Sequence, residues 1–337
     1  MEAVMMQNMS VSEVEVRLIY STTLPVSCAI ILLNLLLILA IACSRRLRGA
    51  QHFFFLSLLV SGVCTGVALP FIPWMGLNRP LSFTSCLLVH VFPNFLFLAF
   101  LCNLVLVHYE RYRSIASPLR RGQLWLHRRF LLPLLAVWAL PLLFALLPAF
   151  GWNNRGLQER SGCCPRPNTT ALPHCTALPG ECCSYRSVFP NSFIYLEVYG
   201  LLAPAILSIA AMTCRVLCIT RGQLRGITRV QRAVADREQR RRMELRYACC
   251  VAAVTLAFLA CWGPYIVYTH VGVELLLRRA GRSGRTGHIV LSCVGIGSTA
   301  VVPLLLGLAN KEYTDPIRKL IRNLQKRCRN SHASTPV

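Results

Sequence analysis

Acidic residues are scarce in this sequence, and charge as a whole is low. Of its 337 residues, 13 are Asp or Glu, 15% are charged and 55% are hydrophobic. Soluble domains are roughly 45–50% apolar and about 25% charged, so an ordinary soluble fold is excluded. The mean hydropathy of +0.51 instead favours a lipid bilayer as the solvent.

Catalytic clusters are missing from the apolar stretches as well. No set of His and carboxylate residues with metal-ligand or acid–base spacing occurs within them, and the cysteines form no Cys-x-x-Cys pair. The sequence therefore predicts no enzyme, no bound metal and no cofactor.

Basic residues, in contrast, are abundant. The 36 Lys and Arg residues give a formal net charge of +23, which would suit nucleic acid if they formed a patch on a soluble fold. Here they stand between apolar runs, without a zinc spacing or an RNA-binding signature. We therefore expect no nucleic-acid binding.

Seven stretches of roughly 20 residues carry few charges, which is the length needed to cross about 30 Å of hydrocarbon as a helix. Lone prolines such as Pro204, Pro264 and Pro303 predict kinks, because neighbouring helices satisfy the freed backbone groups. The predicted fold class is an all-α membrane protein, a seven-transmembrane helix bundle. The helices are expected near residues 20–43, 52–76, 84–109, 130–151, 192–214, 247–271 and 287–309.

The two sides of the membrane differ in basic charge. The loops and tail after the first, third, fifth and seventh runs hold 26 of the 36 Lys and Arg residues, and the other side holds 10. By the positive-inside rule the richer side is cytoplasmic, so the N-terminus lies outside. We expect a multi-pass plasma-membrane protein with three parts: an extracellular N-terminus (1–19), a transmembrane domain (20–310), and an amphipathic helix and cytoplasmic tail (311–337).

Candidate modification sites fall on the predicted outer side. The sequons at Asn8 and Asn168 are both there, where N-glycosylation is possible. Cys86 begins the third run, and the loop after the fourth run holds five more cysteines: Cys163, Cys164, Cys175, Cys182 and Cys183. Six cysteines outside the membrane predict disulfides, whose pairing the sequence leaves open.

Ordered motifs narrow the class, because seven helices alone also fit transporters. Three motifs lie at the inner end of the third run, in the sixth run and after the seventh: Glu110-Arg111-Tyr112, Cys261-Trp262-Gly263-Pro264 and Asn310-Lys311-Glu312-Tyr313. Single landmarks lie in the first, fourth, fifth and seventh runs: Asn34, Trp138, Pro204 and Pro303. The ordered set resembles the rhodopsin-like (class A) G-protein-coupled receptors, which have a short amphipathic eighth helix.

The resemblance implies a switch at the inner face. Arg111 would be held by Glu110, and by Glu244 at the inner end of the sixth helix, while signalling is off. A semi-buried Arg is costly without a partner, so an exchange of partners can bias two helix arrangements. Once freed, Arg111 would meet a heterotrimeric G protein. The other implied switch residues are Tyr112, Trp262 and Pro264.

The inner face also carries a basic run over 225–246 and an amphipathic stretch over 311–327. Attraction to anionic lipid of the bilayer accounts for much of this charge, and it leaves room for contact with a G protein. Cys328, just beyond the amphipathic stretch, is a candidate for palmitoylation.

The chain departs from the family pattern at three polar positions. Gly62 stands where most members carry an Asp, Met212 replaces a Tyr, and Pro303 is followed by Leu304-Leu305-Leu306 instead of ending in Tyr. No carboxylate remains at the centre to hold a cation. We therefore expect neither a central sodium site nor the usual tyrosine and water relay.

A narrower similarity is with the bile acid receptors of that family. It rests on Pro93-Asn94-Phe95, Leu196-Glu197-Val198-Tyr199-Gly200 and Cys261-Trp262-Gly263-Pro264-Tyr265, and runs from about 20 to 325. It implies a bile acid or related amphipathic steroid as ligand, a stimulatory G protein and a rise in cyclic AMP. It also implies that Cys183 pairs with Cys86, with the other loop cysteines free to form local bridges.

The expected ligand site lies in the outer half of the bundle. Pro93 stands where amine receptors keep an Asp, which disfavours amine ligands. Glu197 is an acidic residue well inside an apolar run, and such residues are functional candidates by default. A protonated or internally bonded structural role for Glu197, and a structural role for His90, stay open. The expected ligand-binding residues are His90, Asn94, Phe95, Glu197, Leu201, Trp262 and Tyr265.

Two other functions remain as alternatives. A receptor of the same fold for another steroid or amphipathic lipid would share these features. A secondary transporter is disfavoured, because the inner halves of the helices lack charged residues lining a path and show no inverted repeat.

Overall fold

The computed structural model describes residues 2–43, 50–71, 82–116, 130–156, 188–228, 252–268 and 283–309, with five single positions between 315 and 325. The described residues lie in helices, turns and short connections. The elements are α1 (Glu2–Ala42), α2 (Ala50–Ala68), α4 (Phe83–Ala116), α6 (Leu131–Leu146), α9 (Asn191–Tyr195), the π-helical turn η2 (Leu196–Leu202), α10 (Ala203–Thr228), the helix Ala252–Val267 and α13 (Ser283–Ala309).

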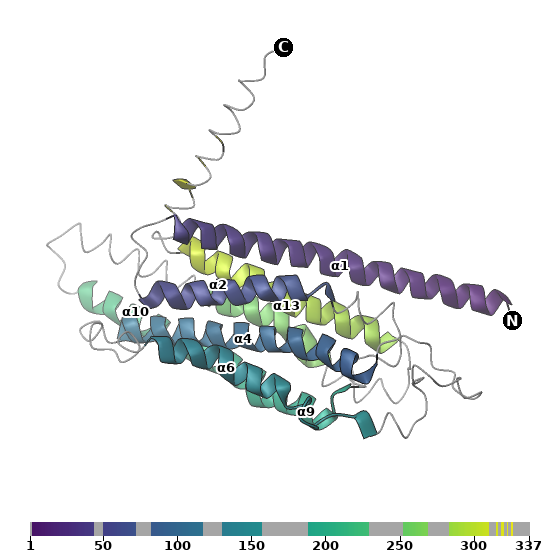
Figure 1. Cartoon of the computed structure of the whole chain (residues 1–337). Coiled ribbons are helices and arrows are strands. Elements are labelled where there is room, and N and C mark those ends of the chain that lie inside the picture. Colours follow the sequence, from purple (N-terminus) through teal and green to yellow (C-terminus); the bar gives the residue numbers. More distant parts are fainter. Residues whose placement is uncertain are drawn as a thin grey trace, which may run out of the picture.

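The seven predicted runs are confirmed as apolar helices. Three are long enough to cross a membrane by themselves, over Val16–Ala42, Phe83–Ala116 and Asn191–Gly222. Four shorter apolar helices cover the other runs: His52–Ala68, Leu131–Leu146, Ala252–Val267 and Cys293–Leu305. In Figure 1 the helices lie side by side with their long axes roughly aligned, as expected for a membrane bundle.

Two helix ends differ from the sequence prediction. α1 begins at Glu2 and not near residue 20, because the residues before Pro25 include no other proline and no glycine to end a helix. Its first part projects beyond the other helices in Figure 1. α2 ends at Ala68 and not near residue 76, since Pro70 disfavours the helical conformation in the residue before it.

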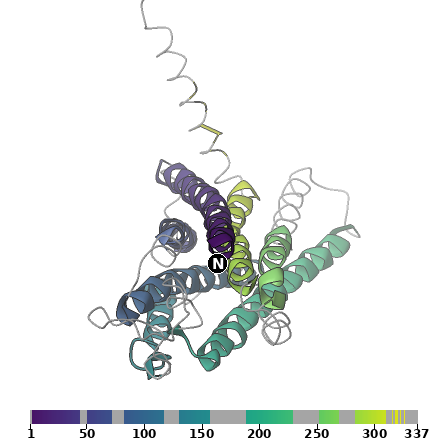
Figure 2. The ribbon, with the colours of Figure 1, turned by 90° about the vertical axis from the view of Figure 1, so that its right-hand side faces the viewer.

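α1 lies between α2 and α13 (Figure 2) and approaches both closely through glycines. Cβ atoms built on Gly66 of α2 and Gly307 of α13 would come within 2.8 Å of Ile30 and 2.7 Å of Leu37. The Ser27 hydroxyl donates to the Gly66 carbonyl oxygen at 2.7 Å. Such close backbone approach is how membrane helices gain packing energy without a hydrophobic driving force.

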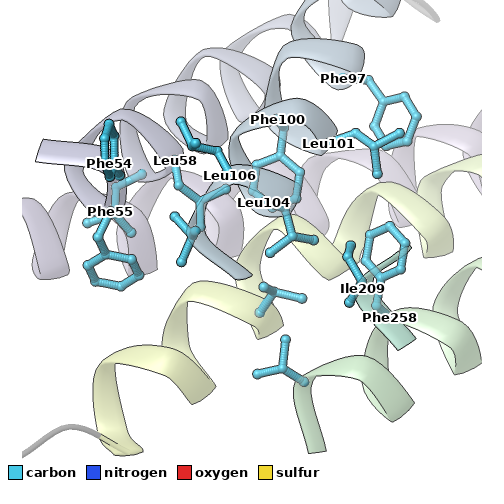
Figure 3. Packing of buried hydrophobic residues seen from close by; sticks show 14 of the residues in the cluster. Phe54, Phe55, Leu58, Phe97, Phe100, Leu101, Leu104, Leu106, Ile209 and Phe258 are labelled. Atoms are coloured by element: carbon cyan, nitrogen blue, oxygen red, sulfur yellow. The ribbon is translucent and has the colours of Figure 1, made fainter. Parts of the chain in front are cut away.

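The main core lies along α4, which is buried over most of its length. Figure 3 shows its phenylalanines and leucines meeting those of α2, together with Ile209 of α10 and Phe258 of the helix Ala252–Val267. Phe54, Phe55, Phe100 and Phe258 are each at most 2% exposed. α4 therefore lies at the centre of the bundle, packed against α2, α6 and α10.

The fifth membrane span contains a π-helical turn, η2, between α9 and α10. Pro204 follows this turn and has no N–H to donate to the carbonyl oxygen one α-turn earlier. The N–H of Ala203 instead bonds the Val198 carbonyl oxygen, five residues back. The wider turn buries Glu197, Val198 and Leu202 together.

Beyond α13 the structure describes five positions, all helical and exposed: Asp315, Arg318, Lys319, Arg322 and Gln325. Their spacing of three and four residues places them on one face of a helix. They form the polar face that an amphipathic eighth helix requires.

Candidate functional site

The C-terminal end of α4 carries an ion pair. Arg111 Nε lies 3.5 Å from Glu110 Oε2, with the side chains 17% and 3% exposed. Tyr112, which follows, is half-buried. Glu244, the other predicted partner of Arg111, lies outside the described residues.

Trp262 is enclosed by side chains from three helices. Its indole Nε1 donates to Ser298 Oγ of α13 at 3.1 Å, and its ring lies 4.4 Å from that of Phe97 of α4, measured between centroids. Tyr265, one turn further along the same helix, meets the indole edge-on at 5.5 Å. A Cβ atom on Gly295 of α13 would come within 3.0 Å of the indole. A shift of Trp262 is thus coupled to α4 and α13.

Sequence reasoning did not find Ser298, Gly295 or Phe97. A serine or glycine in an apolar helix has no distinctive pattern of its own. Ser298 lies five residues before Pro303, but only the packing of α13 against the helix Ala252–Val267 shows that it faces Trp262.

The predicted polar ligand residues are buried. Asn94 and His90 of α4, Glu197 of η2 and Tyr265 are each 8–9% exposed. Asn94 Nδ2 has no hydrogen-bond partner among the described residues. Buried donors without a partner are rare and call for an explanation, such as a ligand or an ordered water.

The predicted apolar ligand residues fall in two places. Leu201 packs against the main core, which contains Trp262 and Tyr265. Phe95 packs instead beside the outer cluster of Cys86, Leu87 and Val91, with its ring 6.2 Å from that of Trp138. The structure thus associates Leu201 more closely than Phe95 with Trp262 and Tyr265.

Four aromatic residues join α6, the end of the long outer loop and α9; we call them the outer aromatic cluster: Phe144, Trp152, Phe189 and Phe193. Phe193 is fully buried and stacks on Phe144 at 5.1 Å and on Phe189 at 5.0 Å. Trp152 meets its edge at 5.7 Å. The ring of His90 lies 6.3 Å from Phe189, so this cluster also supports the N-terminal part of α4.

Hydrogen bonds also connect the residues after α6 to the residues before and at the start of α9. Asn154 donates its backbone N–H to the Val188 carbonyl oxygen and its side-chain Nδ2 to that of Phe189, both at 3.0 Å. The Trp152 indole N–H donates to Ser192 Oγ at 3.2 Å. The segment that leads from the outer loop into the fifth span is therefore held on α6.

Some predicted modification sites are placed and others are not. Cys86 is disulfide-bonded, and its partner lies outside the described residues, as does Cys183. Asn8 lies in α1. Asn168 and Cys328 are outside the described residues, and their modification stays a prediction.

Comparison with known proteins decides the family. The family model described as "7 transmembrane receptor (rhodopsin family)" matches residues 33–305. The chain belongs to this family. As a member it is a multi-pass membrane receptor and not an enzyme, which confirms the fold class and the receptor assignment.

Individual relatives of this receptor span a range of similarity. It is 40% identical over 300 residues to "G-protein coupled bile acid receptor 1" of Rattus norvegicus, covering 88% of this chain and 83% of that protein. It is also 40% identical to the Homo sapiens protein of that name, over 88% and 82% of the two chains. It is 27% identical to "Histamine H2 receptor" of Cavia porcellus, over 90% and 80%.

Proposed function

We propose that this receptor binds a bile acid or a related amphipathic steroid on its outer side and activates a stimulatory G protein, which raises cyclic AMP. The observation that carries the ligand class is the 40% identity to proteins named as bile acid receptors, across most of both chains. The N-terminus faces outward in this proposal, in line with the basic charge on the opposite side.

The outer half of the bundle suits such a ligand chemically. Ligand sites are mostly apolar with a few polar groups that fix orientation. The Asn94 amide has an open donor for a ligand oxygen, and Glu197 and Tyr265 are buried on two other helices. Glu197 and Tyr265 would hydrogen-bond a ring hydroxyl of the steroid. Apolar side chains such as Leu201 would cover its hydrocarbon.

The signal would pass through Trp262, because its packing partners belong to α4 and α13. A ligand against Tyr265 would press on the indole that the tyrosine touches at 5.5 Å. The resulting movement of the helix Ala252–Val267 would free Arg111 at the inner face. The freed guanidinium would then meet the G protein.

Cyclic AMP in cells exposed to bile acids and to uncharged steroids tests this proposal. We expect the parent to respond to bile acids, and Asn94→Ala, Glu197→Ala and Tyr265→Phe to weaken the response at equal surface expression. Tyr199→Phe is the matched control, because Tyr199 is 55% exposed in the same span as Glu197. A response to uncharged steroids alone would assign the site to another steroid, and no response to any bile acid would reject the ligand.

A further inference from the structure

The helices α10 and Ala252–Val267 meet along an apolar seam. Ile209 of α10 and Phe258 of the other helix are each 1% exposed and belong to the same core cluster (Figure 3). Val254, one turn before Phe258, is fully buried there too. Into this seam each helix places one hydroxyl.

The two hydroxyls bond to each other. Thr213 Oγ1 of α10 lies 2.8 Å from Thr255 Oγ1, and the two residues are 4% and 7% exposed. Thr213 Oγ1 is also 2.8 Å from the Ile209 carbonyl oxygen. A hydroxyl has one proton and two acceptor sites, so Thr213 can donate to Ile209 while accepting from Thr255. The seam thus contains a polar link between two helices where little water competes.

This link lies below Trp262 along the same helix. Thr255 precedes Trp262 by seven residues, which is about 10 Å at 1.5 Å per residue. Near Trp262 the helix is bonded to Ser298 of α13, and near Thr255 it is bonded to α10. The helix is therefore held at two levels by two different neighbours, and an inward or outward swing of its inner half must act on the Thr255 bond.

Met212, the neighbour of Thr213, is apolar and packs against the main core. Thr213 therefore supplies a polar contact within an otherwise apolar part of this interface. In this structure Arg111 is 3.5 Å from Glu110, which is the resting arrangement under the proposed function.

We propose that Thr213 and Thr255 are a positioning pair that holds the inner half of the helix Ala252–Val267 against α10 at rest, and that their hydrogen bond breaks on activation. The proposal rests on the proposed G-protein coupling but not on the identity of the ligand. A single hydrogen bond between membrane helices shifts a two-state equilibrium by roughly threefold, and at most by somewhat more than tenfold.

The test compares Thr213→Val, Thr255→Val and the double variant with the parent. Valine keeps the shape of threonine and removes the hydroxyl. Thr220→Val is the matched control, because Thr220 is also buried in α10 at 4% exposure and bonds a carbonyl oxygen of its own helix, that of Val216, at 2.8 Å. Two readouts need no ligand: amide hydrogen exchange of residues 252–267 in nanodiscs, and basal nucleotide exchange on a panel of purified heterotrimeric G proteins.

We expect both single variants to speed amide exchange in 252–267 and to raise basal nucleotide exchange about threefold, while Thr220→Val changes neither. The double variant should exceed neither single, since all three lose the same bond. If the Thr213 and Thr255 variants show the same amide exchange and the same basal nucleotide exchange as Thr220→Val, the proposal is overturned. If amide exchange becomes faster but basal nucleotide exchange stays the same or falls, the proposal is also overturned, because the pair would then stabilise the helix without controlling activation.

The same experiment separates this proposal from the ligand assignment. A parent chain that ignores every bile acid, while the valine variants raise its basal signalling, would reject the ligand and leave the threonine pair standing. If the parent responds to bile acids and the valine variants behave like Thr220→Val, the ligand assignment stands and the proposal for the threonine pair is rejected.

Discussion

The carboxamide of Asn34 occupies the space beside Gly62 that a side chain at position 62 would need. A Cβ atom on Gly62 would lie 2.6 Å from Asn34 Oδ1, closer than such atoms approach in real proteins. Asn34 is fully buried, and its Nδ2 donates to the carbonyl oxygens of Ile30 at 2.8 Å and Thr299 at 3.0 Å. The amide of Asn34 on α1 thus fills the space beside Gly62 of α2.

Replacing Gly62 with alanine should therefore destabilise the receptor. Overpacking a close contact costs about 1–3 kcal/mol, so the midpoint of thermal unfolding in detergent should fall. Gly222→Ala is the control, because a Cβ atom there meets nothing within 4 Å. Adding Asn34→Ala should recover part of the loss caused by Gly62→Ala. Independent, additive losses from the two changes would show that this contact is not the cause.

Removal of the Ser298 hydroxyl should shift the receptor between its two arrangements. Ser298→Ala leaves the Trp262 indole N–H without its acceptor on α13, at a cost of up to about 1.7 kcal/mol for a membrane hydrogen bond. We expect altered basal cyclic AMP at matched surface expression. Ser57→Ala is the matched control, since Ser57 Oγ accepts from the Trp138 indole at 2.9 Å away from the sixth helix. Equal effects of the two serine variants would argue against a special role for Trp262.

The disulfide of Cys86 can be used to identify its partner. Loss of a disulfide typically costs about 2–4 kcal/mol, so Cys86→Ser should lower the unfolding midpoint, and a reducing agent should lower that of the parent. If Cys183 is the partner, Cys183→Ser and the double variant should match Cys86→Ser. Cys43→Ser is the control, because Cys43 is free and exposed. If the double variant unfolds at a clearly lower temperature than either single variant, the two losses are independent and Cys86 pairs with another cysteine.

The outer aromatic cluster should support both stability and ligand response. Phe193→Ala removes a fully buried ring in contact with three others, which should cost about 3–5 kcal/mol. Trp152→Phe keeps an aromatic ring against Phe193 and removes only the hydrogen bond to Ser192, so its effect should be small. The midpoint of thermal unfolding measures the effect on stability, and the half-maximal bile acid concentration measures the effect on the ligand response. A large effect of Trp152→Phe would place the main support in the hydrogen bond.

The inner switch predicts an effect at a residue outside the described part of the chain. Glu244→Gln removes the charge that the family resemblance assigns as a resting partner of Arg111. Basal cyclic AMP should rise, because Arg111 then keeps one partner instead of two. Glu110→Gln should act in the same direction, since Glu110 Oε2 is 3.5 Å from Arg111 Nε. Unchanged basal activity of Glu244→Gln at equal surface expression would contradict this role.

The predictions that succeeded rest on long patterns. Twenty apolar residues in a row have few alternatives to a membrane helix, so all seven runs were found. Trp262 and Tyr265 were expected on one face because they are three residues apart, and their rings do touch. The spacing of residues along one helix was therefore enough to predict which of its site residues lie next to each other.

Contacts between helices could not be predicted in this way. The sequence shows that Gly62 replaces an Asp, but the fact that Asn34 fills the space depends on how α1 and α2 pack. The Thr213–Thr255 bond and the acceptor role of Ser298 are likewise set by the rotation of two helices about their axes. Small hydroxyl residues are tolerated on any face of a membrane helix, because each can bond its own backbone.

The π-helical turn changes how residues in the fifth span correspond to those of other receptors. A π-turn contains one residue more than an α-helix of the same length. If residues are numbered back from Pro204 as in a regular α-helix, the side chains before Leu196 therefore point about 100° away from the direction that this numbering assigns to them. Site residues transferred by such a count from a relative with a regular helix would point to the wrong neighbours in the outer half. Ligand design against this receptor should therefore align the fifth span from its outer end, where Phe193 anchors it, and not from its proline.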